Sequence, residues 1–141
     1  MTRFLVDTNV PSELVRPQPA LNVTAWVAAQ SLDSLFLSVI SLGELRKGIT
    51  ILPPGKRKAG LEAWLEADLL TMFSGRILPM TQSIADRWGV LEGQRQLMGR
   101  PIHVPDAQIA ATALEHGLTV VTRNVKDFEG VGATLINPWD E

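Results

Sequence analysis

Short apolar runs alternate with longer segments of mixed polarity along the chain. Each run is three to five residues long and is bounded by turn-forming or polar residues. Continuous apolar runs of this length predict strands that are buried on both faces, as in a parallel sheet. The predicted strands are residues 4–6, 35–37, 76–78, 118–122 and 134–136.

The segments between these runs predict helices. Ser41 and Glu44 match the capping-box pattern, which predicts that a helix opens at Ser41. Pro105 suits an early helix position and Gly117 suits the position after the last residue, which predicts a helix ending at His116. The other predicted helices are 13–16, 21–30, 56–73 and one opened by Thr81. Strands that alternate with helices predict an α/β fold with helices on both faces of a parallel sheet.

Length and composition narrow the classes of protein that are possible. A chain of 141 residues predicts one domain, 1–141. Hydrophobic residues make up 45% and charged residues 20%, which is typical of a globular protein. The absence of cysteine excludes a disulfide scaffold, a thiol nucleophile and a thiolate metal site. No apolar run approaches the roughly 20 residues of a membrane span, and the start does not resemble a signal peptide, so we expect a cytoplasmic protein.

The net charge of −2 excludes binding of nucleic acid by a globally basic surface. Basic residues are nevertheless concentrated between Glu44 and Glu62, where no acid interrupts them. This stretch is either a solvated helix end or part of a groove for a phosphate backbone. Its members are Arg46, Lys47, Lys56, Arg57 and Lys58, and Arg95, Arg100, Arg123 and Lys126 are candidates to extend it.

Three acidic residues occupy positions that differ from those of the other acids, which fall on predicted helix faces. Asp7 ends the first strand, Glu44 lies in the first turn after the second strand, and Asp106 lies in the first turn before the fourth strand. Asn124 and Asp127 follow that fourth strand. Sites in parallel sheets lie outside the carboxyl ends of the strands, so these residues are candidates for one shared rim. Such oxygen ligands suit Mg²⁺ or Mn²⁺.

Each of these acids also has a purely local explanation. Asp7 can bond the backbone of a turn, and Glu44 can be the second half of a capping box. Asp106 can stabilise the positive end of a helix by about 0.3–1 kcal/mol. The coincidence of three separate elements favours a site, because carboxylates gathered in one cleft raise each other's pKa and cost stability.

Other chemistries find less support. The only histidines, His103 and His116, lack metal-ligand spacing, although His103 lies in a loop from which it can approach a ligand. A phosphatase of the haloacid-dehalogenase type requires an acid at the position of Asn9 and a late lysine, for which Lys126 is a weak candidate. A response-regulator receiver requires an acid after the third strand, where Leu78-Pro79-Met80 has none.

Four short motifs, in this order and at this spacing, resemble those of the PIN domain, and in particular the VapC toxins of the FitB-like subgroup. The resemblance runs from Leu5 to Trp139 and includes the trailing Asn137-Pro138-Trp139. The motifs are Leu5-Val6-Asp7-Thr8-Asn9, Ser41-Leu42-Gly43-Glu44-Leu45, the segment from Pro105-Asp106 to Ala113, and the segment from Val121 to Asp127-Phe128.

This resemblance implies a Rossmann-like parallel sheet and an endoribonuclease dependent on Mg²⁺ or Mn²⁺. It implies an acidic site of Asp7, Glu44 and Asp106, with the metal held by Asp7 and Asp106. Asn124 stands where some relatives have the fourth acid, and Asp127 is the alternative carboxylate. It further implies a homodimer, a cognate antitoxin protein and contact with operator DNA only through that antitoxin.

Overall fold

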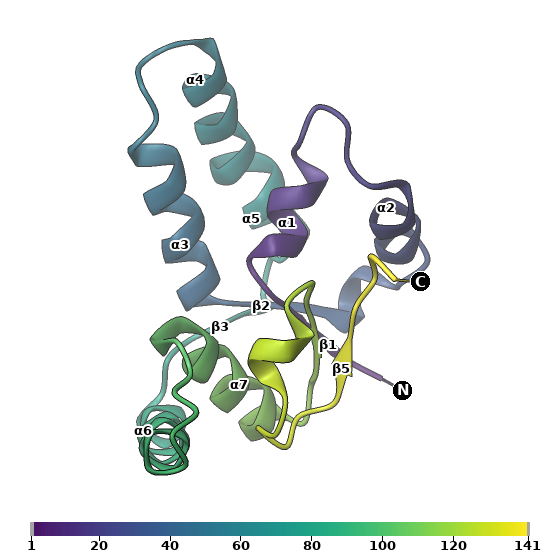
Figure 1. The fold of residues 1–141 in the computed structure, drawn as a ribbon. Coiled ribbons are helices and arrows are strands. Elements are labelled where there is room, and N and C mark those ends of the chain that lie inside the picture. The colour runs from purple at the N-terminus through teal and green to yellow at the C-terminus, as the bar shows by residue number, and fades with distance from the viewer. Residues whose placement is uncertain (1, 141) are drawn as a thin grey trace.

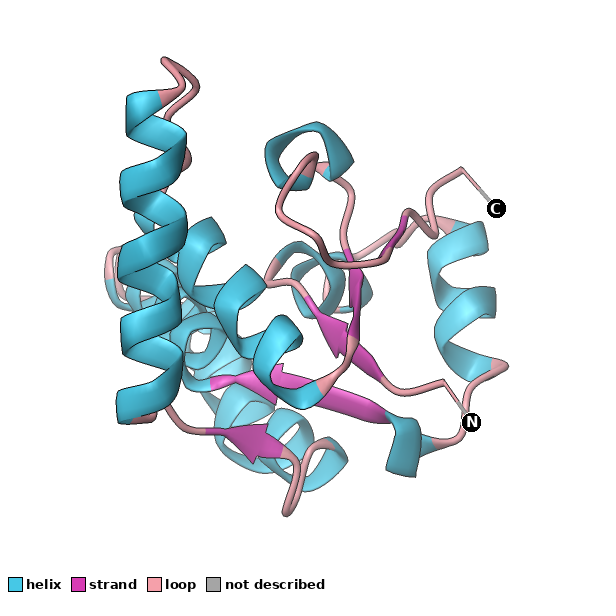
Figure 2. Ribbon diagram, turned by 90° about the horizontal axis from the view of Figure 1, so that it is seen from below, coloured by secondary structure: helices cyan, strands magenta, loops and turns pink. Residues whose placement is uncertain are grey.

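Five short strands form one parallel sheet in the order β3-β2-β1-β4-β5 in the computed structural model, which describes residues 2–140. The central strand, β1, is flanked by β2 on one side and β4 on the other (Figures 1 and 2). All five predicted strands are confirmed, with small differences at their ends. Their bounds are β1 Phe4–Val6, β2 Leu35–Ser38, β3 Ile77–Leu78, β4 Thr119–Val121 and β5 Leu135–Ile136.

Helices cover both faces of the sheet, as predicted (Figure 2). The segment predicted as one helix over 56–73 is helical throughout, but its middle turns widen to π geometry between α4 and α5. The helical elements are α1 Asn9–Leu14, α2 Leu21–Ala28, η1 Leu32–Ser34, α3 Val39–Thr50, α4 Lys56–Ala63, η2 Trp64–Leu69 (π), α5 Leu70–Met72, α6 Gln82–Leu97, α7 Val104–His116 and η3 Val125–Phe128.

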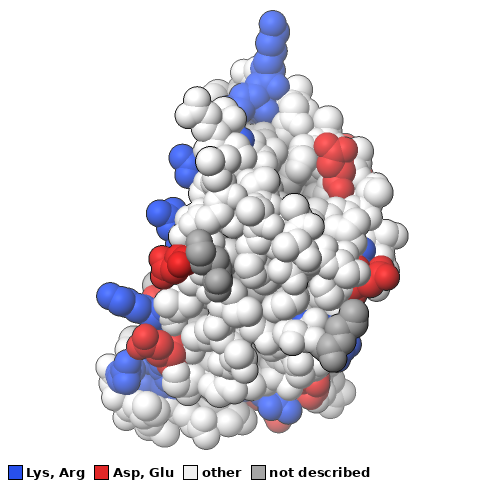
Figure 3. Space-filling view, turned by 90° about the vertical axis from the view of Figure 1, so that its right-hand side faces the viewer, with Lys and Arg blue, Asp and Glu red and all other residues white. Residues whose placement is uncertain are grey.

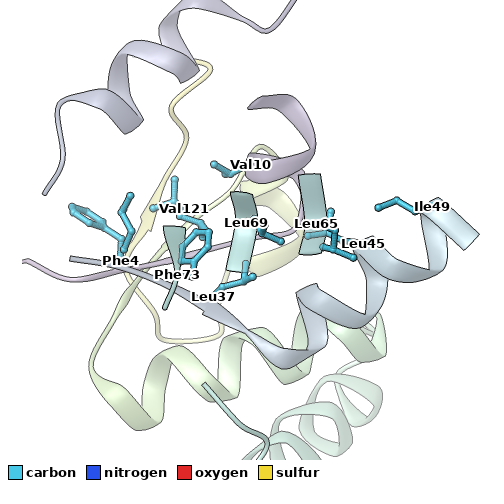
Figure 4. Close-up of a cluster of buried hydrophobic side chains, with 11 residues drawn as sticks. Phe4, Val10, Leu37, Leu45, Ile49, Leu65, Leu69, Phe73 and Val121 are labelled. Carbon is cyan, nitrogen blue, oxygen red and sulfur yellow. The ribbon is translucent and has the colours of Figure 1, made fainter. Parts of the chain in front are cut away.

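The side chains of β1 alternate between two hydrophobic clusters. Phe4 and Val6 pack on one face against residues from α3, η2 and β2 (Figure 4). Leu5 points to the other face, where it packs in a cluster with residues of α6 and α7. Burial on both faces is the pattern expected of a central parallel strand, and it holds the end of β1 in a fixed position.

Two neighbouring strands bring the candidate site together. Val6 on β1 pairs with Val121 on β4, so Asp7 and Thr122 follow at the same carboxyl edge. The chain passes from β1 to β2 and β3 on one side and later to β4 and β5 on the other. The strand order therefore reverses between β1 and β4, which is where ligand sites form in open parallel sheets.

Arg95 was predicted as a possible extension of the basic groove, and this prediction is wrong. Its side chain is buried in α6, where Nε donates to the carbonyl of Arg100 at 2.8 Å and Nη1 to the carbonyl of Glu129 at 2.8 Å. The guanidinium fastens the loop after α6 and the segment after η3 instead of facing a ligand. Hydrogen bonds from a charged donor are among the stronger ones in proteins.

We expect Arg95→Met to lower the free energy of unfolding by about 2–4 kcal/mol, because the two hydrogen bonds that the buried guanidinium donates to carbonyls are lost. Urea denaturation measures this change. Arg87→Met, on the same helix, is the matched control, because Arg87 is exposed and pairs with Glu115 at 3.4 Å. Such a surface pair contributes at most about 1 kcal/mol. Equal effects of the two substitutions would contradict the structural role of Arg95.

Candidate active site

Asp7 is buried at the carboxyl end of β1 and is tied to β4. Its backbone N–H donates to the carbonyl of Val121 at 2.8 Å. The hydroxyl of Thr122 donates to Oδ2 at 2.7 Å, and the backbone N–H of Thr8 donates to Oδ1 at 2.8 Å. Burial raises the pKa of Asp7, the two hydrogen bonds oppose that rise, and the charges of Glu44 and Asp127 add to it. The carboxylate is therefore fixed in place, and the neighbouring negative charges make its ionised form less favourable.

Glu44 does not belong to a capping box, so that part of the sequence prediction is wrong. Helix α3 begins at Val39, and its cap is Ser38, whose hydroxyl accepts from the backbone N–H of Ile40 at 3.0 Å. The last residue of β2 thus caps the helix three residues before the predicted start. Glu44 consequently lies in the second turn rather than the first, and it is exposed.

A hydroxyl from the first motif positions Glu44. Thr8 Oγ1 donates to Glu44 Oε1 at 2.6 Å and lies 2.8 Å from the hydroxyl of the buried Ser41. Because the backbone of Thr8 also contacts Asp7, this one residue connects the acid after β1 with the acid on α3. Within residues 2–140, no residue donates a hydrogen bond to Oε2 of Glu44, the other carboxylate oxygen.

We expect Thr8→Val to reduce the activity of this site about tenfold, because Glu44 loses a charge-assisted hydrogen bond. Thr8→Ser keeps the hydroxyl and is the matched control, with activity close to that of the parent. The comparison is made by steady-state kinetics on whichever substrate the parent turns over. Equal losses in the two variants would show that the hydroxyl does not position Glu44.

Asp106 is the third residue of α7, as predicted, but its environment does not match a simple helix-stabilising anion. Desolvation raises its pKa to about 6, with further contributions from the charges of Asp7 and Asp127, while His103 opposes the rise. A carboxylate that only stabilised a helix end would be more easily ionised than usual. The raised pKa of Asp106 instead reflects burial first and the charges of the neighbouring acids second. His103 lies just before α7 and within electrostatic reach of Asp106.

The segment after β4 brings in the fourth carboxylate. Thr122 Oγ1 accepts from the backbone N–H of Asn124 at 3.0 Å, and the backbone N–H of Asp127 donates to the carbonyl of Asn124 at 3.0 Å. This turn leads into η3, where Asp127 is exposed and contributes to the raised pKa of both Asp7 and Asp106. Asn124 is also exposed, and both residues lie at the predicted rim.

The donor set of this rim suits a hard divalent cation. No Lys or Arg forms a salt bridge with the four carboxylates in the described part of the chain. Within residues 2–140, however, no three His, Cys, Asp or Glu side chains are gathered tightly enough to form a complete metal-binding group. Mg²⁺ commonly keeps several waters and binds through one or two carboxylates, so a pair such as Asp7 and Asp106 meets its needs.

A groove extends from this rim between α1, α3 and α4. Thr8 and Glu44 line one end, and Arg16, Lys56 and Arg57 line other parts of it, over an apolar floor that includes Trp64. The predicted basic stretch is therefore only partly in the groove. Arg46 instead pairs with Glu66 at 3.1 Å, and Lys58 donates to the carbonyl of Thr50 at 3.0 Å.

Lys and Arg do not cover the one face of the molecule that Figure 3 shows. Figure 3 shows the face at the right of Figure 1, near which both termini lie. Most of that face is uncharged, with Lys and Arg along one edge and at the top. This distribution agrees with a net charge of −2.

Sequence reasoning missed the two hydroxyls that organise the acids, Thr8 and Thr122. Their signal was present, because each stands directly beside a strand end that leads into the rim. A hydroxyl placed there supplies the donor that a buried carboxylate needs.

The fold and this site define an α/β protein with an acidic centre at the carboxyl edge of a parallel sheet. A family comparison makes the assignment more specific: the sequence model of the PIN domain matches residues 4–133. The chain belongs to the PIN domain family. This result confirms the predicted family and fold.

Individual relatives match almost the whole chain. It is 40% identical over 137 residues to the VapC ribonuclease Y4jK of Sinorhizobium fredii, covering 97% of this chain and 98% of that protein. It is also 40% identical over 138 residues to toxin FitB of Neisseria gonorrhoeae, covering 98% and 99%. Among solved structures, FitAB bound to an IR36 DNA fragment superposes with a TM-score of 0.91 at 38% identity, covering 96% and 95%. No helix among residues 2–140 is long and apolar enough to cross a membrane.

Proposed function

We propose that this chain is a metal-dependent endoribonuclease that acts as the toxin of a toxin–antitoxin module. The observation that carries the proposal is the convergence of Asp7, Glu44, Asp106 and Asp127 from four separate elements on one rim, where Asp106 has a pKa of about 6. A fold retains mutually repelling carboxylates mainly where a cation or a reaction needs them. The likeness to a VapC ribonuclease and to toxin FitB supports the same conclusion.

In this proposal Asp7 and Asp106 would hold Mg²⁺ or Mn²⁺, Glu44 would complete the site directly or through water, and Asp127 would supply the fourth carboxylate. The cation, when bound, makes water more acidic and screens the charge of the scissile phosphate. Glu44 accepts a proton at Oε2, because Oε1 is engaged by Thr8. The hydrogen bonds from Thr122 and from the backbone of Thr8 favour the ionised form of Asp7, against the effect of burial, and they fix its orientation. Attack of the water oxygen on phosphorus forms one P–O bond and breaks the P–O bond to a ribose oxygen, which leaves with a proton taken from solvent water.

The proposed partners follow from the same relatives. FitAB has been solved on a DNA fragment, which supports a module in which a second protein accompanies the toxin on DNA. We propose that a cognate antitoxin binds this chain and blocks its site, that operator DNA is contacted only through the antitoxin, and that the chain forms a homodimer in the cytoplasm. The phosphatase and receiver alternatives are not retained, because the PIN family covers residues 4–133.

The experiment is incubation of the purified, antitoxin-free chain with total RNA in Mg²⁺ or Mn²⁺, with an EDTA arm and Asp7→Asn alongside. We expect discrete fragments that require both the metal and Asp7, and their ends identify the cleaved RNA. Sequencing of fragment ends is the measurement. Cleavage that persists in EDTA, or in Asp7→Asn protein of normal fold, would reject the proposed mechanism.

A further inference from the structure

Arg123 has an arrangement that differs from those of the other described arginines near the sheet. Its guanidinium carbon lies 5.5 Å from the centre of the Trp139 ring, and the residue is exposed. It forms no salt bridge and its side chain donates no hydrogen bond within residues 2–140. By contrast, the guanidinium groups of Arg76 and Arg95 donate to backbone carbonyls. The charge of Arg123 is thus held in place while its N–H groups stay available.

The backbone of Arg123 is anchored directly beside the carboxylate rim. Its N–H donates to Asn9 Oδ1 at 3.4 Å, and Asn9 Nδ2 in turn lies 3.3 Å from Asp7 Oδ2. The preceding residue is Thr122, which donates to the same Asp7 oxygen. Asn124 and Asp127 follow in the next turn. Arg123 therefore stands between two segments of the site, in a backbone that the site itself fixes.

The C-terminal turn explains how the side chain is held. Asn137 donates through Nδ2 to the carbonyl of Arg123 at 3.4 Å and accepts through Oδ1 from the N–H of Trp139 at 2.9 Å. Asn22 on α2 donates to the carbonyl of Trp139, and the indole packs against the first hydrophobic cluster. This is the Asn137-Pro138-Trp139 segment that resembled the FitB-like subgroup, and it places an aromatic face under the guanidinium.

We propose that Arg123 binds a phosphate of the RNA next to the scissile one, and that Trp139 is the positioning residue that holds it there. This inference rests on the proposed nuclease function. Four carboxylates at the rim repel a phosphate backbone, and a cation fixed on the residue that follows Thr122 offsets that repulsion for a substrate that runs from the rim to Trp139. A stacked guanidinium keeps its planar set of donors, which suits two phosphate oxygens at once. Ordering by Trp139 lowers the entropy lost on binding.

The first test measures binding separately from cleavage. A fluorescein-labelled, single-stranded RNA of mixed sequence, twelve nucleotides long, is titrated in Mg²⁺ with Asp106→Asn protein, and anisotropy is recorded at two salt concentrations. Adding Arg123→Ala to this background is expected to weaken binding about five- to tenfold and to reduce the salt slope by about 0.7. Arg123→Lys keeps the charge but not the planar donors. Its affinity for the RNA is expected to lie between that of the Asp106→Asn background and that of the variant that also carries Arg123→Ala.

Arg3 offers a control for the loss of one stacked guanidinium, and its Nη2 also donates to the carbonyl of His116 at 2.9 Å. Its guanidinium carbon lies 5.7 Å from the centre of the Phe36 ring, but Arg3 precedes β1 and so lies at the amino edge of the sheet, opposite the acids. Arg3→Ala is expected to leave RNA affinity within about twofold of the parent. If Arg123→Ala has no larger effect than Arg3→Ala, the proposed phosphate contact is wrong.

Trp139 is tested by two substitutions that differ in aromatic character. Trp139→Phe keeps a ring under Arg123 and is expected to retain most of the affinity, whereas Trp139→Leu is expected to match Arg123→Ala. Thermal melts show which variants are folded, and RNA affinities are compared only among those. If Trp139→Leu folds and binds RNA like the parent, Trp139 does not position Arg123. The Arg123 result stands on its own if the leucine variant does not fold.

Cleavage of total RNA by otherwise unaltered protein separates this inference from the proposed function. Arg123→Ala is expected to raise KM about five- to tenfold with kcat within about threefold of the parent, as for a group that binds substrate and transition state equally. Parent-like KM in Arg123→Ala, with Asp7→Asn inactive, rejects the inference and leaves the nuclease intact. Absence of both RNA binding and cleavage by the parent rejects both.

Discussion

Asp106→Asn is expected to reduce metal-dependent RNA cleavage by about a thousandfold or more, because a direct ligand of the proposed cation loses its charge. The substitution keeps the size of the side chain and its position at the start of α7. It also removes a half-buried negative charge, because the pKa of Asp106 is raised to about 6 by burial and by the charges of Asp7 and Asp127. Loss of activity is therefore expected without loss of the fold. Fragment yield against time, at saturating Mg²⁺ and at Mn²⁺, measures the effect.

Asp86→Asn is the matched control for this substitution. Asp86 is an exposed acid on α6, a helix on the face covered by the second cluster. The control removes the same charge from the same net-acidic protein, so it corrects for a general change in attraction of RNA. If Asp106→Asn protein cleaves RNA as fast as the parent, the role proposed for Asp106 is wrong, whatever the control shows.

The sheet was predictable because burial on both faces leaves a simple pattern in the sequence. The run at 4–6 is wholly apolar and the run at 118–122 is apolar apart from two threonines, and the structure buries the apolar side chains in the two clusters. Predicted strand ends therefore fell close to the observed ones. Once the sheet was parallel, the rim that joins Asp7 to Thr122 followed from chain direction alone.

The start of α3 was not predictable from its capping pattern. Ser38 and Ser41 are both acceptable caps by residue type, and only Ser41 has a glutamate three residues later. The choice is decided by tertiary structure: Ser41 is needed as a buried partner of Thr8, and Ser38 stands at the last position of β2, where the backbone is still extended. A local rule cannot include a partner that lies 33 positions away along the chain.

The basic residues were also only partly predictable, for a different reason. A run of Lys and Arg gives the local charge but not the partners of each side chain. Arg95 became a buried structural donor, while Arg123, which looked like a minor extension of the groove, was left exposed on Trp139 beside the acids. Contacts between residues far apart in the sequence decide which cations remain available to a ligand.

The acids of the site predict an unusual dependence of stability on pH in the absence of metal. The pKa of Asp106 is about 6 in the folded protein against 3.8 for an ordinary aspartate. The folded state thus binds this proton more tightly than the unfolded state, so its stabilising effect is present below pH 3.8 and is lost as the pH rises towards 6. Burial also raises the pKa of Asp7, which acts in the same direction.

We therefore expect Asp106→Asn to be more stable than the parent at pH 7.5 in EDTA, by about 1–2 kcal/mol after allowance for the solvent contact of a half-buried group. For a domain of this size that corresponds to a Tm higher by about 3–6 °C. The difference is expected to shrink as the pH falls from 6 to 4, because the parent carboxyl becomes protonated. Differential scanning calorimetry over this pH range, with Asp86→Asn as the control, measures it.

Mg²⁺ provides the last part of the same prediction, because a cation that binds only the folded carboxylates stabilises the parent by mass action. Titration with Mg²⁺ at pH 7.5 is expected to raise the Tm of the parent and to close or reverse its gap to Asp106→Asn, whose Tm is expected to change little. A parent that is more stable than Asp106→Asn in EDTA, with no response to Mg²⁺ or Mn²⁺, would show that the four carboxylates do not form a cation site.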